Sequence, residues 1–361
     1  MNPADPVALR FPLVPRPRPA CLPLPARIQA LSELAREAVR QADKSIASTV
    51  LNQAALLASD VGMHDLARQW CRQHAAAHLR ACPLSRAEAI RSLEPLVNLA
   101  RLHIRSGHGP KAYDQLNDLY QAICNHQPAR VDGITIPAHL TRTDPDGDTV
   151  RQWLWRVLIA EGTRALTSAG HWPQALTHLQ RHRGIGNRML DGRQVAIIAS
   201  ATSSDYDGAQ QLLSATMPGE PWENAVAGCL AALCLPPGSQ PARSEIDALA
   251  DRYQHLSREP GLVVFTVRLA LSIIDAARPT GQAVTQDLAS GLTEQIVDAA
   301  DGYAAREALA HDYLASQLSP QRTRQLAQIM SACALGHAHI PPRLLTVLTG
   351  ALEASHAVIQ A

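Results

Sequence analysis

The segment LWRVLIAEGTRALTSAGHWPQALTHLQRHRGIGNRMLDGRQVAIIA, residues 154–199, gives the clearest indication of the fold. Apolar residues recur at helical spacing in its first, middle and last parts. Gly170 separates the first part from the second, and Gly184 and Gly186 separate the second from the third. Because glycine closes a helix in the left-handed conformation at no steric cost, the segment predicts three helices joined by two glycine turns.

The turn at residue 170 recurs along the chain. In each copy an alanine stands five residues after the turn residue, and its small side chain lets the second helix approach the first closely. The pairs are Gly62 and Ala67, Gly107 and Ala112, Gly170 and Ala175, and, as a weaker copy, Ser204 and Ala209. Pro110 and Pro173 stand early in the following helix, where a missing N–H is harmless. The recurrence predicts antiparallel helix hairpins.

The helix before each glycine turn also has a shared pattern. A large apolar residue stands eleven positions before the glycine and a small one seven positions before it: Leu51, Leu96 and Ile159, then Ala55, Ala100 and Thr163. Together with the glycine and alanine, this pattern resembles the tetratricopeptide repeat, which implies an α-solenoid of antiparallel hairpins. The turns are 45, 63 and 34 residues apart, so the repeats are divergent. A non-repetitive helical bundle is the alternative.

Composition favours an all-α, folded chain. Of the 361 residues, 46% are hydrophobic and 4% aromatic, and alanine and leucine dominate, which favours helix over strand. Lys44 and Lys111 are the two lysines among 33 basic residues, and this arginine excess is typical of a GC-rich bacterial genome. The net charge is +1 without a basic block, so nucleic-acid binding is not indicated. No apolar run approaches the length of a membrane span.

The seven cysteines form no CxxC pair, and most lie among apolar neighbours of predicted helices. This pattern indicates buried free thiols in a reducing compartment and predicts a cytoplasmic protein. We expect no metal and no cofactor, because neither an HExxH motif nor a dinucleotide or Walker fingerprint occurs.

The pattern predicts three parts. Residues 1–26 hold eight prolines and are expected to form a disordered tail. Residues 27–235 are expected to form the repeats, with an inserted loop near 126–148. After a linker at 236–241, residues 243–361 form a C-terminal helical region, which is either a separate bundle or a cap.

Residues 171–193, together with Trp155, hold the predicted binding site. Gly184 and Gly186, flanked by arginines, suit a turn that holds a carboxylate or phosphate through backbone N–H groups and guanidinium groups. The alternative is structural: the glycines end one helix, Asp191 caps the next, and the arginines are solvated or pair with this aspartate. The candidate binding residues are Trp155, Trp172, His178, His182, Arg183, Arg188, Asp191 and Arg193.

Three functions follow from these patterns. The leading hypothesis is a helical repeat scaffold that binds a partner protein or peptide in a groove, as a bacterial regulatory or biosynthetic accessory protein. It predicts that replacing Arg183 and Arg193 by alanine weakens partner capture without unfolding. The alternative is a helical enzyme that uses the histidine, arginine and aspartate side chains of 171–193, although no nucleophile motif is present. The third is a structural subunit of a homo-oligomer.

Overall fold

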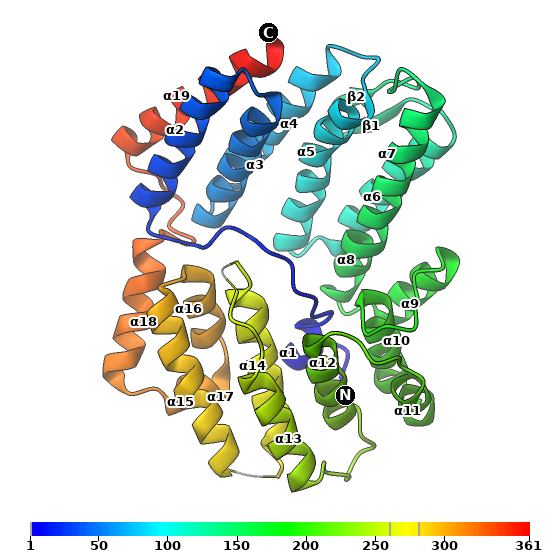
Figure 1. Cartoon of the computed structure of the whole chain (residues 1–361), viewed down its shortest axis with the longest axis vertical. Helices are drawn as coiled ribbons and strands as arrows, with labels where there is room; N and C mark the ends of the chain where they lie inside the picture. The colour runs from blue at the N-terminus through cyan, green and yellow to red at the C-terminus, as the bar shows by residue number, and fades with distance from the viewer. Residues whose placement is uncertain (1, 260, 281) are drawn as a thin grey trace. The chain divides into compact units, whose positions relative to one another are not determined.

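The structure of the protein is a computed structural model that describes residues 2–259, 261–280 and 282–361 (Figure 1). Regular structure in these residues is helical except for one two-stranded hairpin, which confirms the expected all-α class. The chain forms two compact units. Unit 1 consists of Met1–Leu22 and Leu166–Cys333, and unit 2 consists of Pro23–Ala165 and Ala334–Ala361.

Unit 2 is built mainly of helix hairpins that follow one another along the chain. Its elements are α2 (Leu24–Gln41), α3 (Lys44–Val61), α4 (His64–Leu79), α5 (Arg86–Arg105), α6 (Gly109–Cys124), β1 (Ala129–Val131), β2 (Ile134–Ile136), α7 (Asp144–Val157), a π-helical turn η1 (Leu158–Gly162), the first residues of α8 (Thr163–Thr167) and α19 (Pro342–Gln360). The leucines of α3 and α5 that point inward are fully buried in its core.

The predicted hairpin turns are confirmed at all four positions. Gly62, Gly107 and Gly170 have φ angles of 96°, 76° and 75°, and Ser204 has 64°, so each turn residue is left-handed. The alanine that follows each turn by five residues is buried, as expected for closely packed helices. The local hairpins are therefore as predicted, whereas the solenoid and the resemblance to the tetratricopeptide repeat remain predictions.

Asp60 links three helices of unit 2. It lies at the end of α3, and its carboxylate accepts hydrogen bonds from Arg27 of α2 (2.7 Å) and Arg105 of α5 (3.1 Å). Its side chain is almost entirely buried, and a buried carboxylate is tolerated where cations neutralise it. This ion pair network therefore fixes how α2, α3 and α5 pack.

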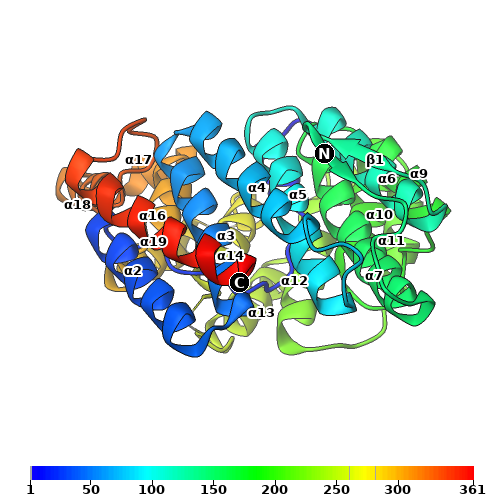
Figure 2. The same cartoon turned by 90° about the horizontal axis from the view of Figure 1, so that it is seen from above.

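The C-terminal helix α19 belongs to unit 2 and lies along α2 and α3 (Figure 2). The segment before it is fixed to the α3–α4 turn, because Gly336 N donates to Asp60 O (2.9 Å) and Ala338 N donates to Val61 O. The chain end thus covers the first hairpin of the unit. Residues 243–361 were predicted as one region, and the structure corrects this: α19 packs in unit 2, and the helices before it pack in unit 1.

Unit 1 surrounds the apolar helix α14 (Val263–Ala277), which packs against α12, α13, α15 and α16. Its other elements are α1 (Pro6–Leu9), α9 (Trp172–Arg181), α10 (Asp191–Thr202), α11 (Tyr206–Ser214), α12 (Pro221–Leu233), α13 (Arg243–Gln254), α15 (Gln282–Ala299), α16 (Gly302–Leu309), α17 (Asp312–Gln317) and α18 (Pro320–Ala332). Since α12 and α13 share this unit, the segment at 236–241 connects neighbours within unit 1 rather than two domains. The unit boundary lies inside α8 instead, so the predicted 27–235 repeat domain is divided.

The proline-rich N-terminus differs from its prediction. Residues 1–26 were expected to be a disordered tail, yet residues 1–22 form part of unit 1 and α2 already begins at Leu24. Phe11, Leu13 and Cys21 are buried there. The physical reason is that apolar side chains between the prolines fill the surface of unit 1, a gain in burial that proline content alone does not reveal.

The predicted loop near 126–148 is shorter than expected. Asp132 and Gly133 form the two-residue turn between β1 and β2, and both have positive φ angles (49° and 89°), as the turn of a tight hairpin requires. Thr143 caps α7 by accepting a hydrogen bond from Asp146 N, so the helix begins before residue 148. Among the described residues, no helix has the length and hydrophobicity needed to cross a membrane.

Candidate functional site

The residues predicted as one binding site are divided between the two units. Trp155 lies half-buried on α7 of unit 2, whereas the candidates from Trp172 onward belong to unit 1. Trp172 is fully buried at the start of α9, and its indole Nε1 donates to Pro3 O (2.9 Å). Its buried ring and its bond to the N-terminus indicate a packing role.

Two arginines of the predicted site are engaged by the protein itself. Arg193 is 6% exposed and donates to Thr216 Oγ1 (3.2 Å), Gly186 O (3.3 Å) and Leu212 O (2.7 Å). Arg188 is bound by the buried carboxylate of Glu223. These bonds hold the 184–188 turn against α11 and α12, so the guanidinium groups face protein acceptors.

The buried carboxylate of Glu223 completes this turn. It also accepts from Met189 N (3.1 Å), and the hydrogen bond from Arg188 is the main reason that the pKa of Glu223 lies below its ordinary value. Asp191 pairs with Arg16 at 2.8 Å. Arg188, Asp191 and Arg193 are therefore engaged by other parts of the protein. The structural alternative is only partly met, because α10 has no side-chain cap from Asp191 and Arg193 is buried rather than solvated.

The remaining candidates lie at the end of α9. His178 is buried, and its ring centroid is 4.8 Å from that of His182. Burial lowers the pKa of His182 below its ordinary value, so this ring is neutral near pH 7. Arg183 is exposed with a φ of 52°, which is the conformation of a residue that ends a helix.

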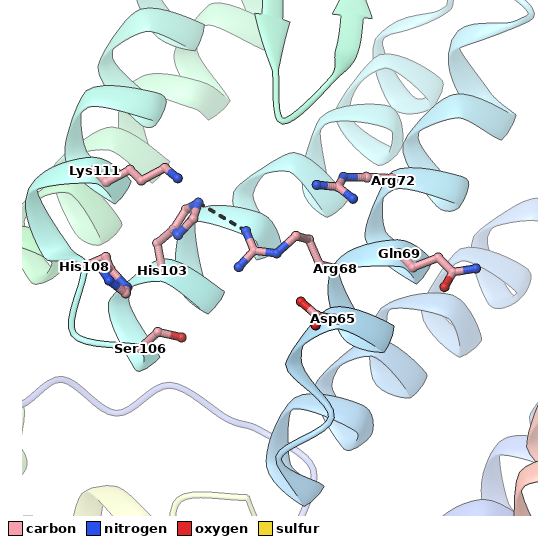
Figure 3. A pocket seen from close by; sticks show the side chains of 8 residues that line it. All are labelled: Asp65, Arg68, Gln69, Arg72, His103, Ser106, His108 and Lys111. Atoms are coloured by element: carbon pink, nitrogen blue, oxygen red, sulfur yellow. Dashed lines mark hydrogen bonds between the residues drawn. The ribbon is translucent and has the colours of Figure 1, made fainter. Parts of the chain in front are cut away.

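A cavity of about 730 Å³ in unit 2 brings together a different set of polar residues (Figure 3). It lies between α4, the end of α5 and the start of α6. Four of its residues come from α4 at spacings of three and four, which places them on one face of that helix. The lining residues are Asp65, Arg68, Gln69, Arg72, His103, Ser106, His108 and Lys111.

The β1–β2 hairpin orients the arginines of this cavity. Arg72 forks onto the carboxylate of Asp132 with bonds of 3.1 Å and 3.0 Å, and it also donates to Asp132 O (3.1 Å). Arg68 approaches the same carboxylate at 3.9 Å. Because the hairpin turn presents Asp132 to α4, it holds two long cationic side chains in place at the cavity.

His103 lies buried in the cavity wall, and Arg68 Nη1 is 3.4 Å from its Nε2 (Figure 3). Burial, with the positive charges of Lys111 and Arg68, lowers the pKa of His103 below its ordinary value. A guanidinium is always a donor, so Nε2 of the neutral ring accepts and its proton is on Nδ1. The ring thus positions Arg68 without adding charge near pH 7.

The cavity carries a positive surplus. Arg68, Arg72 and Lys111 face Asp65 and Asp132 as the opposing charges. In the part of the chain that the structure describes, Lys111 forms no ion pair, and its side chain extends toward His103 (Figure 3). An uncompensated ammonium beside two oriented guanidinium groups is an arrangement that attracts a carboxylate or phosphate.

Two features of the sequence indicate this cavity, although neither belongs to a recognised binding motif. Residues 65, 68, 69 and 72 are polar at helical spacing directly after a predicted hairpin turn. Lys111 is one of two lysines in a chain in which arginine is the default cation. Asp132 had no such signal, because its contact with α4 depends on how the hairpin folds back.

No protein-family model matches this chain, and neither a curated protein nor a solved structure shows detectable similarity to it. Among the described residues, no three histidine, cysteine, aspartate or glutamate side chains are arranged to hold a metal ion. The groups that give the cavity its positive charge and that orient this charge are its arginine, lysine and histidine side chains.

Proposed function

We propose that this chain is a helical repeat scaffold that binds a partner protein or peptide, and that the cavity of unit 2 receives an anionic group of that partner. The observation that supports this most is the cationic surplus of the cavity, which Arg68, Arg72 and Lys111 line together with the buried ring of His103. Guanidinium groups bind carboxylate or phosphate in a forked geometry, and the ammonium adds a point charge.

The dimensions of the cavity suit this role. Its volume of about 730 Å³ accommodates a few side chains of a peptide. Its lining is mostly charged and polar, whereas a site for an apolar small molecule is lined mainly by aliphatic and aromatic groups. An acidic peptide segment or a chain-terminal carboxylate therefore fits better than an apolar ligand.

The proposed setting is the cytoplasm of a bacterium, with a regulatory or biosynthetic accessory role. Two sequence properties support it: the strong excess of arginine over lysine and the absence of a CxxC pair among the seven cysteines. The enzyme alternative has less support, because the polar atoms of Arg188 and Arg193 are bound to Glu223 and to backbone carbonyls.

The proposal is tested by a charge reversal with a matched control. Lys111→Glu removes the ammonium that lies beside His103, and Lys44→Glu makes the same change at the start of α3 outside the cavity. Titration calorimetry at modest salt uses a tetraglutamate peptide as the probe and a tetraglutamine peptide as the neutral control. We expect Lys111→Glu to weaken tetraglutamate binding by about tenfold and Lys44→Glu by about twofold at most.

Two results would contradict the proposal. One is equal weakening by the two reversals, which would indicate a response to net charge alone. The other is equal affinity for the glutamate and glutamine peptides, which would show that the cavity does not select an anion.

A further inference from the structure

The N-terminal residues 10–21, called the arm below, lie on unit 1 in the manner of a bound peptide. Gln194 of α10 is buried, and its side-chain amide pairs with the backbone of one arm residue: Oε1 accepts from Leu13 N (2.7 Å) and Nε2 donates to Leu13 O (2.8 Å). This two-way pairing reads main chain rather than side chain. It is the way in which a receptor holds an extended segment.

The far end of the arm is held in the same way. Asp301 accepts from Cys21 N (2.8 Å), and Gly302 N donates to Cys21 O (2.9 Å). A Cβ at Gly302 would lie 2.7 Å from Cys333 Sγ and 3.1 Å from Cys21 Sγ, so the glycine leaves room for the arm. The start of α16 is therefore shaped around the end of the arm.

Side chains of the arm fill specific places on unit 1. Arg10 donates two hydrogen bonds to Asp275 of α14, both 2.7 Å, and both side chains are mostly buried. Phe11 is 2% exposed. The guanidinium of Arg18 lies 3.8 Å from the ring centroid of Tyr303. Buried arginine and aromatic anchors of this kind dominate the energetics of peptide interfaces.

The covalent connections of the arm resemble those of a ligand. The arm continues at Pro23 into unit 2, so its path to the rest of unit 1 along the chain runs through residues 23–165. Four prolines, at 12, 15, 17 and 19, favour an extended backbone and reduce the entropy that the arm loses on binding. When two molecules exchange such a terminal segment, each contact that is broken within one molecule forms again with the other.

We propose that unit 1 contains a peptide-binding groove, formed by α10, α14 and the start of α16, which the arm of the same chain occupies and which also accepts the arm of a second copy. The arm of the same molecule competes with the arm of a second copy for the groove, at an effective concentration set by its covalent attachment. The fraction of exchanged arms therefore rises with the protein concentration. Reciprocal exchange joins two chains through identical contacts and yields a symmetric dimer. This groove is separate from the cationic cavity of unit 2.

The test uses the full chain and a fluorescent synthetic peptide of residues 6–22. Substituting Arg10→Glu and Phe11→Ala within the chain weakens its own arm and leaves every groove residue unchanged. We expect the peptide to bind this arm-weakened chain at least about tenfold more tightly than it binds the native chain, because the internal competitor is weakened. A peptide that carries the same two substitutions should bind at least about tenfold more weakly than the native peptide.

A graded control uses Arg16, whose ion pair with Asp191 is half-exposed. A peptide with Arg16→Glu should lose at most about fivefold in affinity, because exposed ion pairs contribute little. In sedimentation, the native chain should form dimers as its concentration rises, and the arm-weakened chain should remain a monomer.

Three outcomes would overturn the proposal. The first is that the folded arm-weakened chain fails to bind the native peptide, or that it binds the native and the substituted peptide equally. The second is that the arm-weakened chain loses the cooperative unfolding of unit 1, which would show that the arm is part of the core. The third is that the native chain remains a monomer at every concentration, which would show that the groove does not accept the arm of a second copy.

Discussion

The turn at 183–193 and the cavity at 65–111 are both rich in arginine, yet their arginines have different partners. In unit 1, Arg193 is buried and donates to two backbone carbonyls and a hydroxyl, and Arg188 is bound by Glu223. In unit 2, Arg72 is oriented by one aspartate and remains 43% exposed at a cavity that also contains Lys111. Arg193, whose three guanidinium nitrogens all donate internally, stabilises the fold. Arg188 and Arg72 are each paired with one carboxylate and are similarly exposed, so the ammonium of Lys111, unpaired among the described residues, is what distinguishes the cavity as a place for a ligand.

The largest expected effect is that of Arg193→Ala on stability. The substitution removes three hydrogen bonds, to Gly186 O, Leu212 O and Thr216 Oγ1, and leaves a cavity where the buried guanidinium lay; Leu212 O keeps its bond from the Thr216 hydroxyl. We expect the free energy of unfolding to fall by about 2–4 kcal/mol, measured by urea denaturation. Lys111→Ala is the control and should change it by less than about 0.5 kcal/mol. Equal effects of the two substitutions would remove the distinction between structural and available cations.

This expectation revises the one drawn from the sequence. There, Arg183→Ala together with Arg193→Ala was expected to weaken partner capture without unfolding. In the structure, Arg193 is buried and its guanidinium has three acceptors, so it is part of the packing. We therefore expect the double substitution to destabilise the protein through the loss of Arg193.

A smaller effect is expected from acid on unit 2. Burial lowers the pKa of His78 from 6.5 to about 4, with Arg91, Lys44 and His356 adding to the shift and Glu88 opposing it. The folded state therefore binds fewer protons than the unfolded state between these pH values, and stability falls as the pH falls. His78 alone should account for a loss of about 2 kcal/mol in the free energy of unfolding between pH 6.5 and pH 5.

Urea denaturation at several pH values measures this loss. The neighbouring His74 is also buried, and its pKa lies well below the ordinary value for the same reason, so the loss in the native protein should exceed that from His78 alone. His78→Gln retains a hydrogen-bonding group opposite Ser48 and should remove part of the pH dependence. An unchanged slope in this variant would show that His78 is not a source of the acid sensitivity.

The smallest expected effect is that of Arg183→Ala. Arg183 is exposed at the end of α9, so its removal should change the free energy of unfolding by less than about 0.5 kcal/mol. Affinity for the tetraglutamate peptide should equal that of the native chain, because Arg183 does not line the cavity. A clear loss of affinity would reinstate the 183–193 turn as a binding site and weaken the comparison on which the proposed function depends.

The helices and their turns were predictable because their signals are local. The turn residues Gly62, Gly107, Gly170 and Ser204 all adopt the left-handed conformation that their sequence context predicts. By contrast, apolar spacing does not decide where α16 ends and α17 begins: there the side chain of His311 accepts a hydrogen bond from Leu314 N and caps the second helix. A side chain that caps a helix competes with the helical pattern, and periodicity alone does not decide which prevails.

The predicted site could not be evaluated from the sequence because the partners of its arginines are distant along the chain. Asp191 pairs with Arg16, and Trp172 donates to Pro3, across more than 160 residues in both cases. The proline content of residues 1–26 also predicted a disordered tail. Proline frequency indicates a backbone preference, and it does not show whether a complementary surface exists elsewhere in the fold.

The sequence by itself determined the all-α class, the four hairpin turns and the helices that flank these turns. These depend on backbone conformation and on apolar spacing within one or two helical turns, which are properties of neighbouring residues. The tertiary structure decided the division into two units, the return of α19 to α2 and α3, the docking of the arm and the separation of structural from available cations. Each of these depends on which surfaces meet after the chain has folded back, and that pairing is a property of the whole fold.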